Sequence, residues 1–84
     1  MSSENNQTEQ VDVQLDTRGL SCPLPLLKLK QKLNQMERGQ MVDVTTTDQG
    51  SVRDFSAFLE QVGHILHHQS QQGGEYRFII EKTR

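Results

Sequence analysis

The chain of 84 residues has few of the groups that could cross-link it or hold it in a membrane. Its single cysteine excludes an internal disulfide, and a lone thiol is typical of proteins in a reducing cytoplasm. No apolar run approaches the roughly 20 residues that cross a bilayer, and no signal peptide opens the chain. We therefore expect a cytoplasmic protein without direct membrane association.

Large apolar side chains are scarce as well. The chain has no Trp, and hydrophobic residues make up 32% of it, so the core is expected to be thin and to lie between two layers. Residues 1–10 are polar and without periodicity, which predicts a disordered N-terminal tail. The remainder, residues 11–84, is expected to form a single domain.

Charge is unevenly distributed along the chain. The net charge of -2 argues against a general nucleic-acid-binding protein. Between Thr17 and Met36, however, every charged residue is basic: Arg18, Lys28, Lys30 and Lys32. These side chains could steer the protein toward acidic partner surfaces, or they could simply form a solvated helix face.

Hydrophobic periodicity predicts the order βαβαββ. Strict alternation or β-branched residues indicate strands over 11–16, 41–48 and 75–82, with a less regular strand over 64–71. A helical stripe of Leu26, Leu29, Leu33 and Met36 follows Pro23 and stops at Gly39, and a second helix covers 50–63. In the second helix, Ser51 and Asp54 resemble a capping box. The expected fold is an α+β two-layer sandwich, a four-stranded mixed sheet with two helices on one face.

Cys22 stands directly before the first helix, next to both prolines of the chain. Proline is favoured in a first helical turn, so Pro23 at the first helical position would make Cys22 the N-cap. Because Pro25 has no N–H, Leu24 N–H is the donor left for the sulfur. A thiolate there meets the positive end of the helix dipole, which predicts a lowered pKa for Cys22. Arg18 and the lysines of the same helix, Lys28, Lys30 and Lys32, are expected to add to the effect. The alternative is a buried, inert cysteine.

One thiol without a second cysteine cannot run a dithiol–disulfide cycle within the chain. The candidate bases for hydrolysis are His64, His67 and His68, but nothing in the sequence places them beside Cys22. Their spacing matches no zinc motif, so we expect no metal, with His64 and His68 on one strand face and His67 on the other. A thiol that takes a group from one protein and gives it to another fits these limits.

Three segments resemble the TusA/SirA-type sulfur-carrier family: "LDTRGLSCPLPLLKLKQKL", "TTDQGSVRDFSAFLEQVGH" and "YRFIIEK". The family signature, a glycine followed shortly by Cys-Pro-x-Pro at the start of a helix, matches Gly19, Cys22, Pro23 and Pro25. The pair Arg53–Asp54 also falls on family positions, without a fixed role. The resemblance implies a TusA-like domain of the same βαβαββ fold.

For Cys22 the resemblance implies a persulfide, accepted from a cysteine desulfurase or another sulfane-sulfur donor and passed to an acceptor protein in a sulfur relay. Such a protein is a stoichiometric carrier more than an enzyme with a pocket. It needs no cofactor and is expected to be a monomer. Leu20, Leu24 and Leu27 could form an apolar docking rim around the thiol.

Two departures separate the sequence from the branch that supplies transfer RNA thiolation. Leu24 replaces an acidic residue between the prolines, and Gln49-Gly50-Ser51 replaces an Asp-Pro-Ala-Thr-like loop. The resemblance therefore leaves four pathways open: transfer RNA thiolation, sulfur oxidation, molybdenum-cofactor supply and selenium metabolism. The alternative class is a small RNA- or protein-binding regulatory module without thiol chemistry. We expect no nucleic-acid binding, because the predicted open sheet face is mixed to acidic: Asp12, Gln14, Asp16, Asp43, Arg77 and Glu81.

Overall fold

The computed structural model describes residues 11–84, so the predicted disordered tail over 1–10 lies outside the described residues. The elements follow the predicted order: β1 Val13–Thr17, α1 Leu24–Gln35, β2 Met41–Thr46, α2 Gly50–Val62, β3 Ile65–Gln72 and β4 Glu75–Glu81. The four strands form one mixed sheet in the order β1-β2-β4-β3. β1 and β2 are parallel, while β4 is antiparallel to both β2 and β3.

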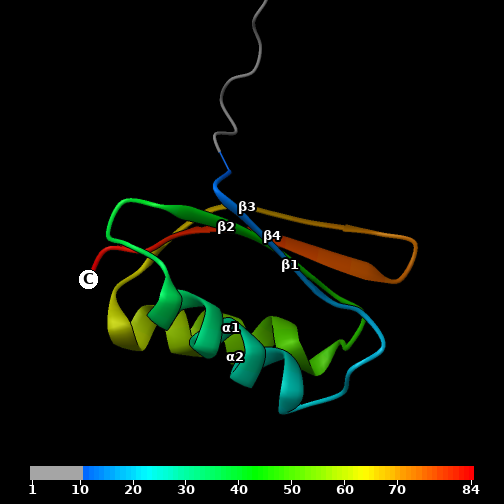
Figure 1. The fold of residues 1–84 in the computed structure, drawn as a ribbon. Coiled ribbons are helices and arrows are strands. Elements are labelled where there is room, and N and C mark those ends of the chain that lie inside the picture. Colours follow the sequence, from blue (N-terminus) through cyan, green and yellow to red (C-terminus); the bar gives the residue numbers. More distant parts are fainter. Residues whose placement is uncertain (1–10) are drawn as a thin grey trace, which may run out of the picture.

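Both helices cover the same face of the sheet, and within residues 11–84 no helix or strand covers the opposite face, called here the open face (Figure 1). The expected two-layer α+β sandwich is therefore confirmed. Of the helices in the described part of the chain, none combines the length and the apolar character that a bilayer-spanning helix requires.

The core fills the space between the helices and the two central strands. Its buried members come from α1 and its C-cap, α2, β2 and β4, and they are Leu29, Leu33, Met36, Val42, Val44, Phe55, Leu59, Phe78 and Ile80. The predicted stripe of α1 is thus confirmed, although Leu26 is only partly buried. The rings of Phe55 and Phe78 meet edge to face with their centroids 4.9 Å apart, an arrangement that aromatic pairs favour.

A hydrogen-bonded lysine joins the end of α1 to the end of the sheet. The ammonium group of Lys82 donates to the carbonyl oxygens of Leu33 and Met36, each at 2.7 Å. The last carbonyls of a helix have no intrahelical partner, and a cation there also suits the negative end of the helix dipole. Lys82 therefore caps α1 from outside the helix.

In the outer strand β3, the histidine side chains lie on other faces of the sheet than predicted. All of its residues are exposed, and a register shift between Leu66 and His68 interrupts the alternation. His67 bonds Glu81 at 2.7 Å, and His68 pairs with Ile79 in the register, so both lie on the face that Ile79 and Glu81 share. The predicted opposition of His67 and His68 is wrong because the bulge adds a residue to β3. His64 precedes the strand.

Leu29 and Leu27 provide a matched test of the packing, since both lie on α1 but are 0% and 46% exposed. Leu29→Ala should lower the free energy of unfolding by about 2–5 kcal/mol, because it removes buried methyl groups and leaves a cavity. Leu27→Ala should change it by less than about 0.5 kcal/mol. Urea unfolding followed by circular dichroism measures both values, and equal losses would contradict this assignment of the core.

Candidate functional site

The loop from β1 to α1 carries the cysteine motif, and a glycine fixes how the loop leaves the sheet. Gly19 has φ +83, a left-handed conformation that residues with a side chain adopt at a cost. Its N–H donates to Thr47 Oγ1 at 2.9 Å, which ties the loop to the segment after β2. A glycine is therefore favoured at position 19, just before the motif, because the backbone there is left-handed.

The helix begins one residue later than predicted. Pro23 is the N-cap of α1 and Leu24 is its first residue, so the prediction that Cys22 is the N-cap is wrong. Leu24 N–H donates to Ser21 O at 2.9 Å and not to the sulfur, and Leu27 N–H bonds Pro23 O at 3.1 Å. Pro25 becomes the second helical residue, where its missing N–H has no intrahelical partner to lose. The bond between Cys22 and Pro23 is cis.

The sulfur of Cys22 is exposed and is not in a disulfide, which contradicts the alternative of a buried, inert cysteine. It lies 3.2 Å from Oδ2 of Asp54, a residue of α2 that is 32 positions away in the chain. Because a carboxylate only accepts hydrogen bonds, the thiol is the donor in this contact. The site is therefore a thiol–carboxylate pair formed between the loop before α1 and the N-terminal part of α2.

This pair overturns the expected ionisation of the thiol. The hydrogen bond to Asp54 raises the pKa of Cys22, and partial loss of hydration and the negative charges of Asp54 and Asp48 raise it further. The predicted lowering relied on the positive end of α1. That end carries only about half an elementary charge, whereas Asp54 brings a full negative charge within hydrogen-bonding distance.

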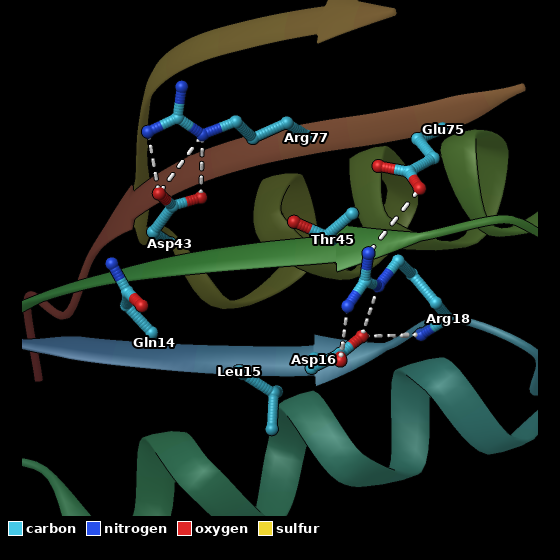
Figure 2. A pocket seen from close by; sticks show the side chains of 8 residues that line it. All are labelled: Gln14, Leu15, Asp16, Arg18, Asp43, Thr45, Glu75 and Arg77. Carbon is cyan, nitrogen blue, oxygen red and sulfur yellow. Dashed lines mark hydrogen bonds and ion pairs between the residues drawn. The ribbon is translucent and has the colours of Figure 1, made fainter. Parts of the chain in front are cut away.

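Arg18 does not contribute positive charge to the thiol as expected. Its guanidinium bonds Asp16 at 2.9 Å and approaches Glu75 at 3.5 Å, on the open face of the sheet (Figure 2). The hydrogen bonds from the Arg18 side chain and N–H lower the pKa of Asp16 to about 2. Lys28 is exposed on α1. The basic residues near Cys22 in the sequence are thus not what sets its pKa.

The open face holds a second cluster of charges around a hollow of about 440 Å³. Arg77 of β4 forms a bidentate contact with Asp43 of β2, with distances of 2.6 to 3.0 Å (Figure 2). As predicted, this face is mixed in charge, and its cations are paired with carboxylates. Asp12 is an exception to the predicted list, because it precedes β1 and accepts Met41 N–H at 2.9 Å.

The start of α2 is stabilised differently from the predicted capping box. Gln49 is the N-cap without a side-chain hydrogen bond, and Ser51 is buried, donating to Asp48 Oδ2 at 3.1 Å. The prediction for Ser51 and Asp54 is wrong because the helix begins at Gly50, which leaves Ser51 inside its first turn. Asp54 is therefore available to Cys22. Arg53 is exposed beside a shallow hollow that Tyr76 also lines.

Apolar side chains next to the thiol are exposed on α1. Leu24 and Leu27 are 45% and 46% exposed, whereas Leu20 is half-buried. Among residues 11–84, no group of three or more His, Cys, Asp or Glu side chains gathers in a way that could hold a metal ion. The site thus consists of one thiol, one carboxylate partner and an apolar surface.

Fold and site together define a small α+β protein that presents a single exposed thiol just before a helix. The family model described as sulfurtransferase TusA matches residues 13–82. The sulfur carrier protein TusA of Allochromatium vinosum is 47% identical over 72 residues, covering 86% of this chain and 95% of the relative. The sulfur carrier protein TusA of Pseudomonas aeruginosa is 36% identical, with 89% and 95% covered.

A solved structure gives the same fold. The crystal structure of a SirA-like protein from Desulfitobacterium hafniense matches with a TM-score of 0.74 at 22% identity, covering 86% of this chain and 99% of that one. The chain belongs to the TusA family of sulfurtransferases, as the matched family model and the identity to the curated relatives establish.

The position of Arg18 yields a test of the electrostatics at the thiol. Arg18→Gln should leave the apparent pKa of Cys22 unchanged, because the guanidinium is paired with Asp16 and Glu75 on the sheet. The rate of alkylation by iodoacetamide, measured by mass spectrometry as a function of pH, reports this pKa. An upward shift in the variant would mean that Arg18 does stabilise the thiolate.

Proposed function

We propose that this protein is a cytoplasmic sulfur carrier that holds a sulfane sulfur as a persulfide on Cys22. The observation that carries the proposal is the exposure of the chain's one cysteine at the Cys-Pro-x-Pro motif of a TusA-family fold. Relatives that are named sulfur carrier proteins support the same role.

The chemistry needs only the sulfur of Cys22. The Cys22 thiolate attacks the outer sulfur of a persulfide on the donor, a new S–S bond forms, and the donor's cysteine leaves as a thiolate that takes up a proton. Attack by an acceptor cysteine on the outer sulfur then reverses the sequence and returns Cys22 to its thiol form. No net oxidation or reduction occurs, so neither step requires a cofactor.

The donor is a cysteine desulfurase or another protein with a sulfane sulfur, and the acceptor is the next protein of a relay. Because the sulfur must be reached by two different cysteines in turn, an exposed position outside a deep pocket suits this task. Leu24 and Leu27 supply the apolar surface that a partner would cover, and their exposed side chains lie on the first turns of the helix that follows Cys22. A monomeric carrier leaves this surface free.

The persulfide proposal predicts a mass change confined to one residue. After incubation with a cysteine desulfurase and cysteine, the wild-type protein should gain the mass of one sulfur atom. Cys22→Ser should gain none, because a hydroxyl does not attack sulfane sulfur. Intact-protein mass spectrometry measures both, and a wild-type mass that stays unchanged with desulfurase and with other sulfane donors would contradict the carrier role.

The docking surface is tested separately from the chemistry. Leu27→Glu should slow persulfide formation from the desulfurase by about tenfold when the carrier is below saturation, because a residue at the centre of an interface contributes more than about 1 kcal/mol. Ile65→Glu is the matched control, since Ile65 is 45% exposed but lies on β3. Equal slowing of both variants would contradict a partner site on α1.

A further inference from the structure

The contact between Cys22 and Asp54 joins the loop before α1 to helix α2. The thiol comes from the loop before α1 and the carboxylate from α2, and their atoms are 3.2 Å apart. A sulfur at a helix start would ordinarily turn toward backbone N–H groups. In this protein it turns toward a carboxylate, and Leu24 N–H bonds a backbone carbonyl instead.

Asp54 is held in place by its neighbours in α2. Phe55, the next residue, is fully buried against Phe78, and Ser51, one turn earlier, is buried and bonded to Asp48. Asp54 itself is half-buried. On the other side, Gly19 ties the loop of Cys22 to Thr47. The loop of Cys22 and the helix of Asp54 are therefore each attached to the segment around 46–51, which sets how the sulfur and the carboxylate face each other.

Building on the proposed carrier function, we propose that Asp54 is a positioning residue that restrains Cys22 in the free protein by accepting its S–H proton in a hydrogen bond. The restraint keeps the empty carrier as a thiol, which reacts slowly with oxidants and electrophiles because the thiolate is the nucleophile. It is relieved when a partner protein covers the site and takes over the contacts of Asp54.

The carboxylate of Asp54 also protects the loaded carrier, through its negative charge, because the Cys22 sulfur then carries the outer sulfur in place of a proton. When the thiolate of a small thiol attacks the outer sulfur, a new bond joins these two sulfurs and the small thiol becomes a persulfide. The bond to the Cys22 sulfur breaks, and Cys22 leaves as a thiolate that takes up a proton. A thiol with a higher pKa is the poorer leaving group in such an exchange. The carboxylate of Asp54 therefore slows the loss of sulfur to small thiols outside a partner complex.

The charged groups around the thiol agree with this role. Asp54 faces it from α2, and Asp48 acts on it from the segment between β2 and α2. Both carboxylates favour the protonated thiol, while Arg18 is engaged with Asp16 and Glu75 on the sheet. Lys28 is exposed on α1.

Asp54→Asn tests the restraint without any sulfur donor. The pH dependence of alkylation by iodoacetamide should shift downward relative to the wild type, and alkylation at pH 7 should be faster. Glu60→Gln removes the same charge from an exposed position of α2 and should leave the profile unchanged. Asp54→Glu, which keeps the carboxylate, should restore a profile close to that of the wild type and serves if the amide variant folds poorly.

A second measurement uses the loaded protein. After persulfidation, incubation with glutathione should return Asp54→Asn to its unloaded mass faster than the wild type and faster than Glu60→Gln. An alkylation profile or a sulfur loss for Asp54→Asn equal to that of the wild type would overturn the proposal. If the wild type cannot be loaded at all, the carrier function fails, but the alkylation profiles still decide the role of Asp54.

Discussion

The packing of the Phe55 ring against the Phe78 ring is the contact on which the geometry of the site depends. It fixes α2 against the central strand β4, and the residue before Phe55 is the one that meets the thiol. Leu29 and Leu33 hold α1 on the same face of the sheet. The geometry between a loop cysteine and a helix carboxylate is thus set by the apolar core and does not rest on the polar contact itself. In general, a packed core holds the reactive side chains of a site in position.

Two electrostatic effects compete at Cys22, and their distances decide the outcome. The dipole of α1 acts through partial charges on N–H groups, and its influence falls off within the first turn. The carboxylate of Asp54 carries a full charge in direct contact with the sulfur. A position at a helix start is therefore not enough to make a reactive thiolate. The side chains that the tertiary fold brings to the sulfur determine whether the thiolate or the protonated thiol is favoured.

The fold was readable from the sequence because hydrophobic period and turn residues are local signals. The stripe of Leu29, Leu33 and Met36 and the alternation of Tyr76, Phe78 and Ile80 each specify an element and its inner face. The motif around Cys22 also pointed to the residue that carries the proposed chemistry.

The wrong predictions concern features that depend on contacts between distant segments or on a shift of one residue along the chain. The partner of the thiol is 32 residues away in the chain, and no local pattern places these two side chains together. The first helix begins at Leu24 and not at Pro23, which moves Cys22 out of the capping position. The bulge in β3 reverses the facing of His67, and Arg18 pairs across the sheet with Glu75. Only the pairing of Arg53 and Asp54 in the family resemblance hinted that α2 contributes to the site.

The place of β4 in the sheet has a consequence for how the chain comes to fold. Strand β4 follows both helices in the chain but lies inside the sheet, between β2 and β3. Lys82, directly after β4, bonds the carbonyl oxygens of Leu33 and Met36, which are 49 and 46 residues earlier. During synthesis both helices leave the ribosome before β4, so the sheet that they cover is still incomplete at that time. Closure of the core must wait for β4, and pairings between distant segments are the slow ones in folding. A chain truncated before Glu75 would lose an interior strand, and with it the support of both helices.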